Sequence, residues 1–345
     1  MKILHILSFT IIFVLVACNS SDSTVNEVEA TQKLINNQNE LYVGFVIDTL
    51  REERWYRDKE IFEEEIKSLG GNVKTLAANG DQNVQVEQAK LLINEGVDVL
   101  VVVPTDASDA SEIVHMAHDA DVKVISYDRL ILDADVDYYL SFDNEKVGKL
   151  QAEAILEKVS SGNFAYVGGA ESDNNSKLLR EGSLQVLQRL IDNGEIELVY
   201  NEFTDNWSPD VAKENIIQFM EETDQGLDAV IAANDGTAGG VIEAFGDQAG
   251  TIPISGQDAE LAALQRIVAG TQTMTVYKSI SLIAKEAAKL AIDVGNNETI
   301  TTDTSIKNGN KDVPSILLDP ISVTKENIQE TVIADGVYGE KEIFE

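Results

Sequence analysis

The pair Arg54-Trp55 lies just after the first predicted strand of the chain, which covers residues 41–47. An arginine guanidinium is planar and permanently charged, and it presents its N–H groups as a fork. The neighbouring indole offers a broad apolar face with one N–H at its edge. Together they suit a small polar molecule that also has apolar faces, and a sugar ring has both. The pair therefore indicates a binding site rather than a catalytic one.

Polar and aromatic side chains also follow most of the later apolar runs. In chain order the set comprises Asp128, Arg129, Asp173, Asn175, Trp207, Asn234, Asp258 and Lys278. Carboxylates, amides and guanidinium groups can bridge adjacent hydroxyls, and an indole packs on the C–H face of a pyranose. Any one of these residues could instead cap a helix or pack between domains. Chance capping would not bring both tryptophans of the chain into one set, so we expect a common site for a neutral polyol.

The elements that must position these side chains alternate along the chain. Runs that predict strands lie near residues 41–47, 72–78, 98–103, 122–127, 163–168, 196–203, 228–233, 252–255 and 272–276. Stretches that predict helices lie between them, at 56–69, 82–95, 107–120, 145–159, 174–193, 208–222, 236–247, 259–269 and 279–294. This alternation is typical of parallel sheets covered on both faces, and ligands bind at the carboxyl edge of such sheets. Because 345 residues exceed what one core usually holds, we expect two α/β lobes, each with a doubly wound parallel sheet.

The start of the chain has the pattern of an export signal. A weakly basic beginning precedes an almost wholly apolar core at 6–16, which is too short to span a bilayer well. The core ends at Leu15-Val-Ala-Cys18, which resembles a bacterial lipobox, and Cys18 is the only cysteine. We therefore expect a lipoprotein signal peptide at 1–18 and a lipid anchor on Cys18, which would hold an exported protein at a membrane, in the periplasm or on the cell surface. The polar segment 19–39 predicts a flexible tether.

The formal net charge of −34, from 60 acidic and 26 basic side chains, argues against some partners. Nucleic acids and anionic lipid surfaces both require a basic face, so we expect neither to bind. A soluble, well-solvated surface explains the excess of acid.

The sequence offers little for an enzyme. Beyond the signal segment its histidines are His115 and His118, with no further metal ligands nearby, and no glycine-rich nucleotide loop follows the first strand. The segment Asp133-Ala-Asp-Val-Asp137 begins like a calcium loop, but Tyr138 occupies the position of the turn glycine. We expect a solvated acidic turn there, and we expect no catalysis, no cofactor and no resident metal.

Longer segments around these residues resemble the periplasmic sugar-binding proteins of ABC importers, in particular the ribose-, galactose- and xylose-binding group. The resemblance runs from residue 41 to 335 and is most specific in Leu50-Arg-Glu-Glu-Arg-Trp55, Tyr127-Asp-Arg129, Ser141-Phe-Asp-Asn-Glu-Lys-Val-Gly148, Gly168-Gly169 with Asp173-Asn-Asn175, Asn234-Asp-Gly-Thr-Ala-Gly-Gly240, Ser255-Gly-Gln-Asp258, 269–278 and 308–315. The surroundings of Trp207 and the segment Ala170-Glu-Ser172 depart from the family pattern, so the loops around the sugar are expected to differ in detail.

The resemblance implies a type I periplasmic binding protein whose two lobes are joined by a three-segment hinge. The implied hinge segments are Phe142-Asp-Asn144, Val276-Tyr-Lys278 and Asp312-Val-Pro-Ser315. One lobe would then comprise 41–142 with 279–312, and the other 145–277 with 313–345.

The resemblance also implies the ligand and its contacts. D-xylose would be bound by Arg54, Asp128, Arg129, Asp173, Asn175, Asn234, Asp258 and Lys278, with the ring held between Trp55 and Trp207. A monomer would capture the sugar between its lobes and deliver it to an ABC permease in the membrane. A related monosaccharide on the same fold, or a sugar sensor that feeds a receptor kinase, are the alternatives.

Overall fold

The computed structural model describes residues 32–302 and 304–345. The expected signal peptide at 1–18, the lipidation of Cys18 and the tether up to residue 31 lie outside the described residues. Residues 32–39 differ from the flexible tether that the sequence predicts, because they contact the folded body. Lys33 Nζ lies 2.6 Å from a carboxylate oxygen of Asp98, and the Leu34 N–H donates to the carbonyl of Glu95. The folded part of the chain therefore begins before residue 40.

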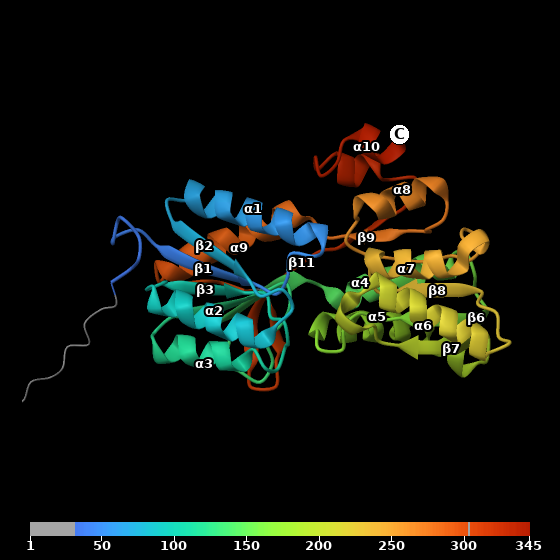
Figure 1. The fold of residues 1–345 in the computed structure, drawn as a ribbon, viewed down its shortest axis with the longest axis horizontal. Coiled ribbons are helices and arrows are strands. Elements are labelled where there is room, and N and C mark those ends of the chain that lie inside the picture. The colour runs from blue at the N-terminus through green and yellow to red at the C-terminus, as the bar shows by residue number, and fades with distance from the viewer. Residues whose placement is uncertain (1–31, 303) are drawn as a thin grey trace, which may run out of the picture. The chain divides into compact units, whose positions relative to one another are not determined.

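The first lobe is built on a seven-stranded sheet, in the order β10-β11-β5-β4-β3-β1-β2 (Figure 1). The strands are β1 (Tyr42–Ile47), β2 (Asn72–Ala77), β3 (Val99–Val102), β4 (Lys123–Tyr127), β5 (Tyr138–Phe142), β10 (Thr304–Lys307) and β11 (Asp312–Leu318). All neighbours are parallel except the antiparallel pair β10 and β11. Every residue of β1 and β3 is buried, as continuous apolar strands covered on both faces should be.

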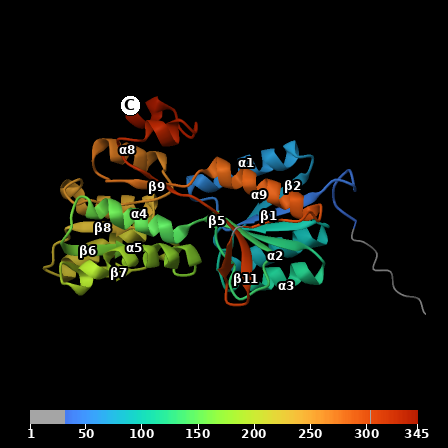
Figure 2. The same cartoon turned by 180° about the vertical axis from the view of Figure 1, so that it is seen from behind.

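Helices cover both faces of this sheet. On one face α1 (Glu53–Ser68) packs beside α9 (Ile280–Gly295), and Figure 2 shows these two helices together although they come from opposite ends of the chain. On the other face lie α2 (Gln82–Asn94) and α3 (Ser111–Asp119). The α9 helix presents small residues, among them Ala284 and Ala288, to the cluster around Phe62, so the two helices pack closely over the sheet.

The second lobe has a parallel sheet in the order β7-β6-β8, formed by β6 (Gly162–Val167), β7 (Ile196–Glu202) and β8 (Ala229–Ala232). A separate antiparallel pair joins β9 (Thr275–Tyr277) to β12 (Ile321–Val323). The predicted strand at 252–255 is reduced to an isolated bridge between Val230 and Ile254.

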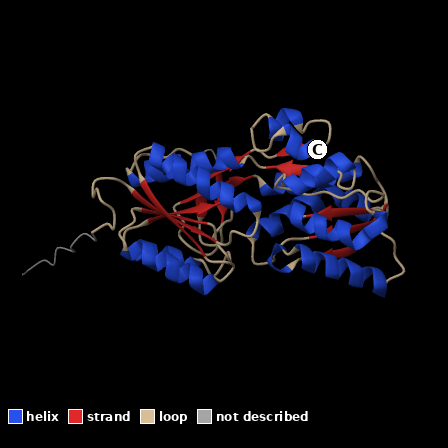
Figure 3. Ribbon diagram, turned by 45° about the horizontal axis from the view of Figure 1, so that its top comes forward, coloured by secondary structure: helices blue, strands red, loops and turns tan. Residues whose placement is uncertain are grey.

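Helices again lie on both sides of the second lobe's strands (Figure 3). One side carries α4 (Asn144–Leu156) and α5 (Asn174–Asp192), and the other carries α6 (Pro209–Glu222) and α7 (Asp235–Phe245). The helix α8 (Leu261–Ala269) packs with the C-terminal segment, which includes a π-helical turn (Gln329–Ile333) and α10 (Glu340–Phe344). None of the helices in the described part of the chain is long and apolar enough to cross a membrane.

The chain crosses between the lobes three times, and the structure corrects the position of the third crossing. The first two lie between β5 and α4 and between β9 and α9, as the resemblance implies. The third was expected at 312–315, with residues from 313 in the second lobe. Instead, Ser315 to Leu318 pair in parallel with β5, so the crossing falls after Leu318, immediately before β12. The reason is burial: Val313 belongs to the core cluster on the α2 and α3 face of the first lobe.

Candidate functional site

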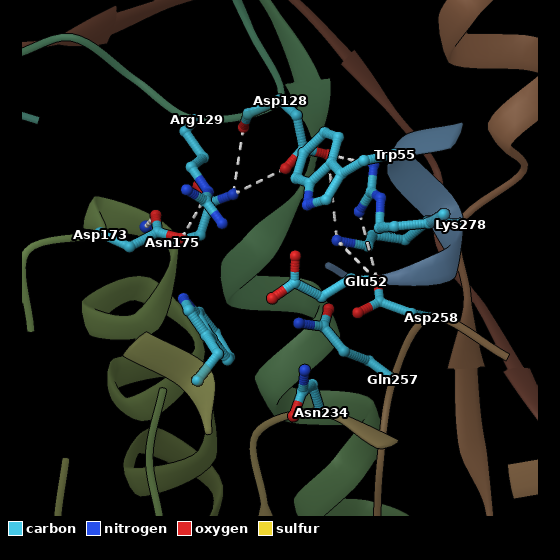
Figure 4. Close-up of a pocket in the computed structure, with 12 residues that line it drawn as sticks. Glu52, Trp55, Asp128, Arg129, Asp173, Asn175, Asn234, Gln257, Asp258 and Lys278 are labelled. Atoms are coloured by element: carbon cyan, nitrogen blue, oxygen red, sulfur yellow. Dashed lines mark hydrogen bonds and ion pairs between the residues drawn. The ribbon is translucent and has the colours of Figure 1, made fainter. Parts of the chain in front are cut away.

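One cavity is lined by all ten residues that the sequence singled out for sugar binding. It lies between the strand ends of the two lobes and encloses about 360 Å³ when its open mouth is included. Figure 4 shows the side chains converging on it from both lobes. The lining residues are Arg54, Trp55, Asp128, Arg129, Asp173, Asn175, Trp207, Asn234, Asp258 and Lys278, together with Glu52 and Gln257. Fold topology thus brings together residues that are far apart in the sequence.

Arg54, in the first turn of α1, is the centre of an ion-pair network. Its guanidinium donates to Asp128 at 2.9 Å, to Asp258 at 3.2 Å and to Asp58 at 3.3 Å. Lys278 Nζ adds a second cation, 3.3 Å from Asp258 and 4.0 Å from Asp128. Burial by itself raises the pKa of Asp128, but the charges of Arg54, Lys278 and Arg129 outweigh it and lower the value to about 2. Asp128 is therefore a carboxylate at any physiological pH.

Arg129 forms a second link between the lobes. Its Nη1 donates to Asp48 of the first lobe at 2.7 Å, and its Nε lies 2.8 Å from Asp173 of the second. Burial lowers the pKa of Arg129, but Asp173 and Asp48 raise it further than burial lowers it. The guanidinium therefore stays charged although its side chain is buried.

The two tryptophans differ in their surroundings. Trp55 is 2% exposed and belongs to the core cluster of the first lobe, with the Arg54 guanidinium 4.3 Å from its ring centroid. Trp207 is only partly buried and lies against the backbone of Gly169, where a Cβ would come within 2.2 Å of the indole. Gly169 is therefore required for this close approach. Both rings line the cavity, and the sandwich around a sugar ring stays a prediction.

The amides and Asp173 combine capping with a place in the cavity. Asp173 accepts from the Asn175 N–H at 2.8 Å as the N-cap of α5, and its other carboxylate oxygen pairs with Arg129. Asn234 caps α7 by accepting from the Thr237 N–H at 2.8 Å. Asn175 Nδ2 donates to the carbonyl of Asp128 at 3.1 Å, across the lobes. Capping and binding are thus compatible for these residues, because each side chain has more than one polar atom.

Backbone strain is concentrated in this site. Asp128, Trp207 and Asp258 have φ angles of 61°, 55° and 92°, in the region that favours glycine. The Asp128 carbonyl accepts from the hydroxyls of Tyr139 and Ser141 at 3.1 and 2.6 Å, which holds its conformation. Strained residues fixed in this way are typical of functional sites.

Sequence reasoning missed Glu52 and Gln257. Both lie inside the family-like segments given above. Glu52 belongs to a charged run that resembles a solvated helix start, and Gln257 directly precedes Asp258, whose carboxylate is the more obvious sugar ligand. In the structure, Glu52 Oε2 and Gln257 Oε1 are buried without a hydrogen-bond donor.

Two acids, the buried Asp235 and the partly buried Glu260, lie beside the cavity, near Asn234 and Asp258 in the sequence. Asp235 is fully buried and accepts from Gln272 at 2.7 Å and Thr275 at 2.9 Å. Burial and the charge of Glu260 raise the pKa of Asp235 well above its usual range. Burial and the charge of Asp258 raise the pKa of Glu260 to about 7.

The acidic segment 133–137 is held by neighbouring basic side chains and a histidine ring. Asp137 lies 2.8 Å from His118 and 2.9 Å from Lys123, and Asp135 lies 2.7 Å from Lys311. Within the described residues no three His, Cys, Asp or Glu side chains are grouped so as to hold a metal ion.

Comparison with known proteins gives consistent matches. Residues 43–299 match the model of the family described as periplasmic binding protein domain. The chain is 47% identical over 306 residues to the D-xylose-binding periplasmic protein of Escherichia coli (strain K12), covering 88% of this chain and 93% of that one. It is 45% identical over 307 residues to the protein of the same name from Haemophilus influenzae, with coverage of 88% and 92%.

Solved structures show the same fold. A carbohydrate transporter solute-binding protein from Chloroflexus aurantiacus, in complex with D-glucose, superposes with a TM-score of 0.82 at 33% identity. The match covers 88% of this chain and 98% of that one.

Proposed function

We propose, from the premise that this chain belongs to the periplasmic binding protein family, that it captures D-xylose between its two lobes and delivers it unchanged to an ABC permease. The observation that carries the proposal is the convergence of ten residues with sugar-binding chemistry on one cavity between the lobes. The relatives that share nearly half of its residues are D-xylose-binding proteins, which favours a pentose.

The chemistry of the cavity suits a neutral polyol. The carboxylates of Asp128 and Asp258 can accept hydrogen bonds from sugar hydroxyls. Arg54 and Lys278, which lie beside these carboxylates, can donate hydrogen bonds to the hydroxyl oxygens. An indole at Trp207 can pack on the C–H face of the ring. The sugar would favour closure only through contacts to both lobes at once, and residues of both lobes line the cavity.

We propose binding without a chemical step. No serine, cysteine or histidine is among the described residues that line the cavity, so no hydroxyl or thiol nucleophile is paired with a histidine base there. The carboxyl group of Asp128 is held as a carboxylate, because neighbouring cations lower its pKa to about 2, so it does not serve as a proton donor.

We also propose that the protein is an exported lipoprotein. The lipobox ending at Cys18 supports a lipid anchor, and the polar residues that follow would link the anchor to the lobes. The anchored, monomeric binding protein would then meet its permease at the same membrane.

A related monosaccharide is the second candidate ligand. The Chloroflexus aurantiacus structure holds D-glucose at 33% identity and 98% coverage of that chain. Discrimination between a pentose and a hexose depends on the space available for one CH₂OH group, which the residue types alone do not set.

Titration calorimetry of the chain from residue 19 onward, against D-xylose, D-ribose, L-arabinose, D-glucose and D-galactose, tests the proposal. We expect D-xylose to bind most tightly. Clear heat with another sugar and none with D-xylose would replace the pentose by that sugar. No heat with any of them would contradict sugar binding itself.

A further inference from the structure

One edge of the cavity, formed by Glu52 and Gln257, carries two buried acceptors that lack donors. Glu52 Oε2 and Gln257 Oε1 are both shielded from solvent and accept no hydrogen bond. The whole Gln257 residue is 3% exposed, and both side chains line the cavity (Figure 4). A buried acceptor without a partner costs free energy, so this edge is incomplete until a donor enters it.

Among the described residues, the ion pairs around the cavity also leave Glu52 without a partner. Three carboxylates of the lining are matched by three cations, in the pairs Arg54 with Asp128, Arg129 with Asp173, and Lys278 with Asp258. Glu52 is the remaining carboxylate of the lining, and none of the ion pairs among the described residues includes it.

Neither side chain is used by the local secondary structure. Glu52 is the N-cap of α1, yet its carboxylate does not cap the helix, and only its backbone carbonyl accepts, from the Trp55 N–H. Gln257 is held by its backbone, because its carbonyl accepts from the Asp235 N–H and the next N–H donates to Val276. The two acceptors come from opposite lobes, so one ligand can meet both only between the lobes.

We propose that Glu52 and Gln257 are specificity-determining residues that accept hydrogen bonds from hydroxyl groups at one edge of the bound sugar. The inference rests on the proposed function, because it takes the ligand to be a sugar. A carboxylate only accepts, so Glu52 requires an O–H donor at a defined position of the ring. A sugar that lacks this hydroxyl leaves Oε2 of Glu52 buried and unpaired, and the site rejects it.

The test combines variants with sugars that lack one hydroxyl each. Glu52→Leu removes the acceptor and keeps an apolar stem, and Gln257→Met keeps the length of the side chain without its amide. Calorimetry measures the affinity of each protein for D-xylose and for its four singly deoxygenated analogues. We expect the wild type to bind at least one analogue about tenfold or more weakly than D-xylose.

In the Glu52→Leu protein we expect D-xylose and that analogue to bind with similar affinity. The affinity for D-xylose should fall about tenfold, and the affinity for the analogue should not change. Gln257→Met should remove the penalty at the same hydroxyl or its neighbour. Glu53→Gln is the matched control, since it removes the same charge one residue along from a side chain that does not line the cavity. It should leave the whole pattern unchanged.

Some results would contradict the role of this edge, and a different result would contradict the proposed ligand. If both variants keep the wild-type pattern, or lose affinity equally for every sugar, the edge does not read a hydroxyl. Glu52→Gln, which retains an acceptor, guards against a folding defect, and it should keep a reduced form of the discrimination. If the wild type binds another monosaccharide instead of D-xylose, the proposed ligand fails, and the deoxygenated analogues of that sugar then test the edge.

Discussion

Two edges of the same cavity differ in how their polar groups are satisfied. At the ionic edge, Arg54 and Lys278 contact Asp128 and Asp258, and every charge has a partner. At the acceptor edge, Glu52 and Gln257 have buried oxygens without donors. The ionic edge is complete without a ligand and connects the lobes, whereas the acceptor edge needs one. Both edges line the cavity, so we expect the ionic edge to support lobe contact and sugar binding together, and the acceptor edge to affect mainly the choice of sugar.

The largest expected effect comes from removing the centre of the ionic edge. Arg54→Met leaves Asp58, Asp128 and Asp258 without their shared cation in a buried place. We expect a loss of about 3–5 kcal/mol in the free energy of unfolding, because breaking a buried ion pair strands its partner. Urea denaturation followed by circular dichroism measures it, and sugar binding should be lost as well.

Lys59→Met is the matched control, because it removes a cation of the same helix that pairs with Glu63 at the surface. Its effect should stay below about 1 kcal/mol. An equally small effect of Arg54→Met would mean that the ionic edge does not hold the first lobe together.

Asp258→Asn separates the connection between the lobes from the stability of the first lobe. Arg54 keeps its contacts with Asp58 and Asp128, while the carboxylate that faces it from the second lobe becomes neutral. We expect sugar affinity to fall about 100-fold, with a smaller change in unfolding than in Arg54→Met. Calorimetry and urea denaturation on the same samples decide it. A large loss of stability with intact binding would reverse the assignment.

Substitutions of the two tryptophans should have smaller effects on affinity and stability. Trp207→Phe reduces the face offered to a sugar, and we expect roughly a tenfold loss of affinity with little change in unfolding. Trp55→Phe alters a residue of the core cluster and should lower stability by about 1–3 kcal/mol. Quenching or shift of fluorescence upon titration with D-xylose reports on each remaining indole. Undiminished affinity in Trp207→Phe would contradict a role for that ring in binding.

The smallest expected effect is a dependence of stability on pH. Burial and Asp258 raise the pKa of Glu260 to about 7, and burial raises the pKa of Asp58 to about 6 despite Arg54 and the Tyr127 hydroxyl. A raised pKa means that the native state binds the proton more tightly than the unfolded state does. This contribution is complete below the unfolded values, near 4.5 and 3.8, and is lost as pH rises through about 7 and 6.

We therefore expect the free energy of unfolding to decline between about pH 5 and pH 8. Glu260→Gln should flatten the upper part of this decline, and Glu63→Gln, at the surface, should not. Urea denaturation across the pH series is the measurement. A wild-type curve that rises over this range would show that other groups dominate.

The sequence predicted that the ten residues would lie together because each follows an apolar run, and parallel strands end at one edge, and the structure places all ten around one cavity. It could not place β11, since pairing with β5 depends on a partner far away in the chain and not on local pattern. Glu52 was hidden for a different reason. A charged residue at a helix start is usually solvated, whereas one carboxylate oxygen of Glu52 is buried in the folded structure.

The late crossing after β11 has a consequence for how the protein is made. The sheet face that α1 covers is complete only when α9 has been synthesised. In addition, the Asn308 side chain donates to the carbonyl of Ile131, 177 positions earlier. The second lobe needs Val323 and Val332 for its own core. Neither lobe can therefore finish folding before most of the chain has been synthesised, because contacts of such long range form slowly and late. We expect the nascent chain to remain unfolded long enough to be threaded through a membrane.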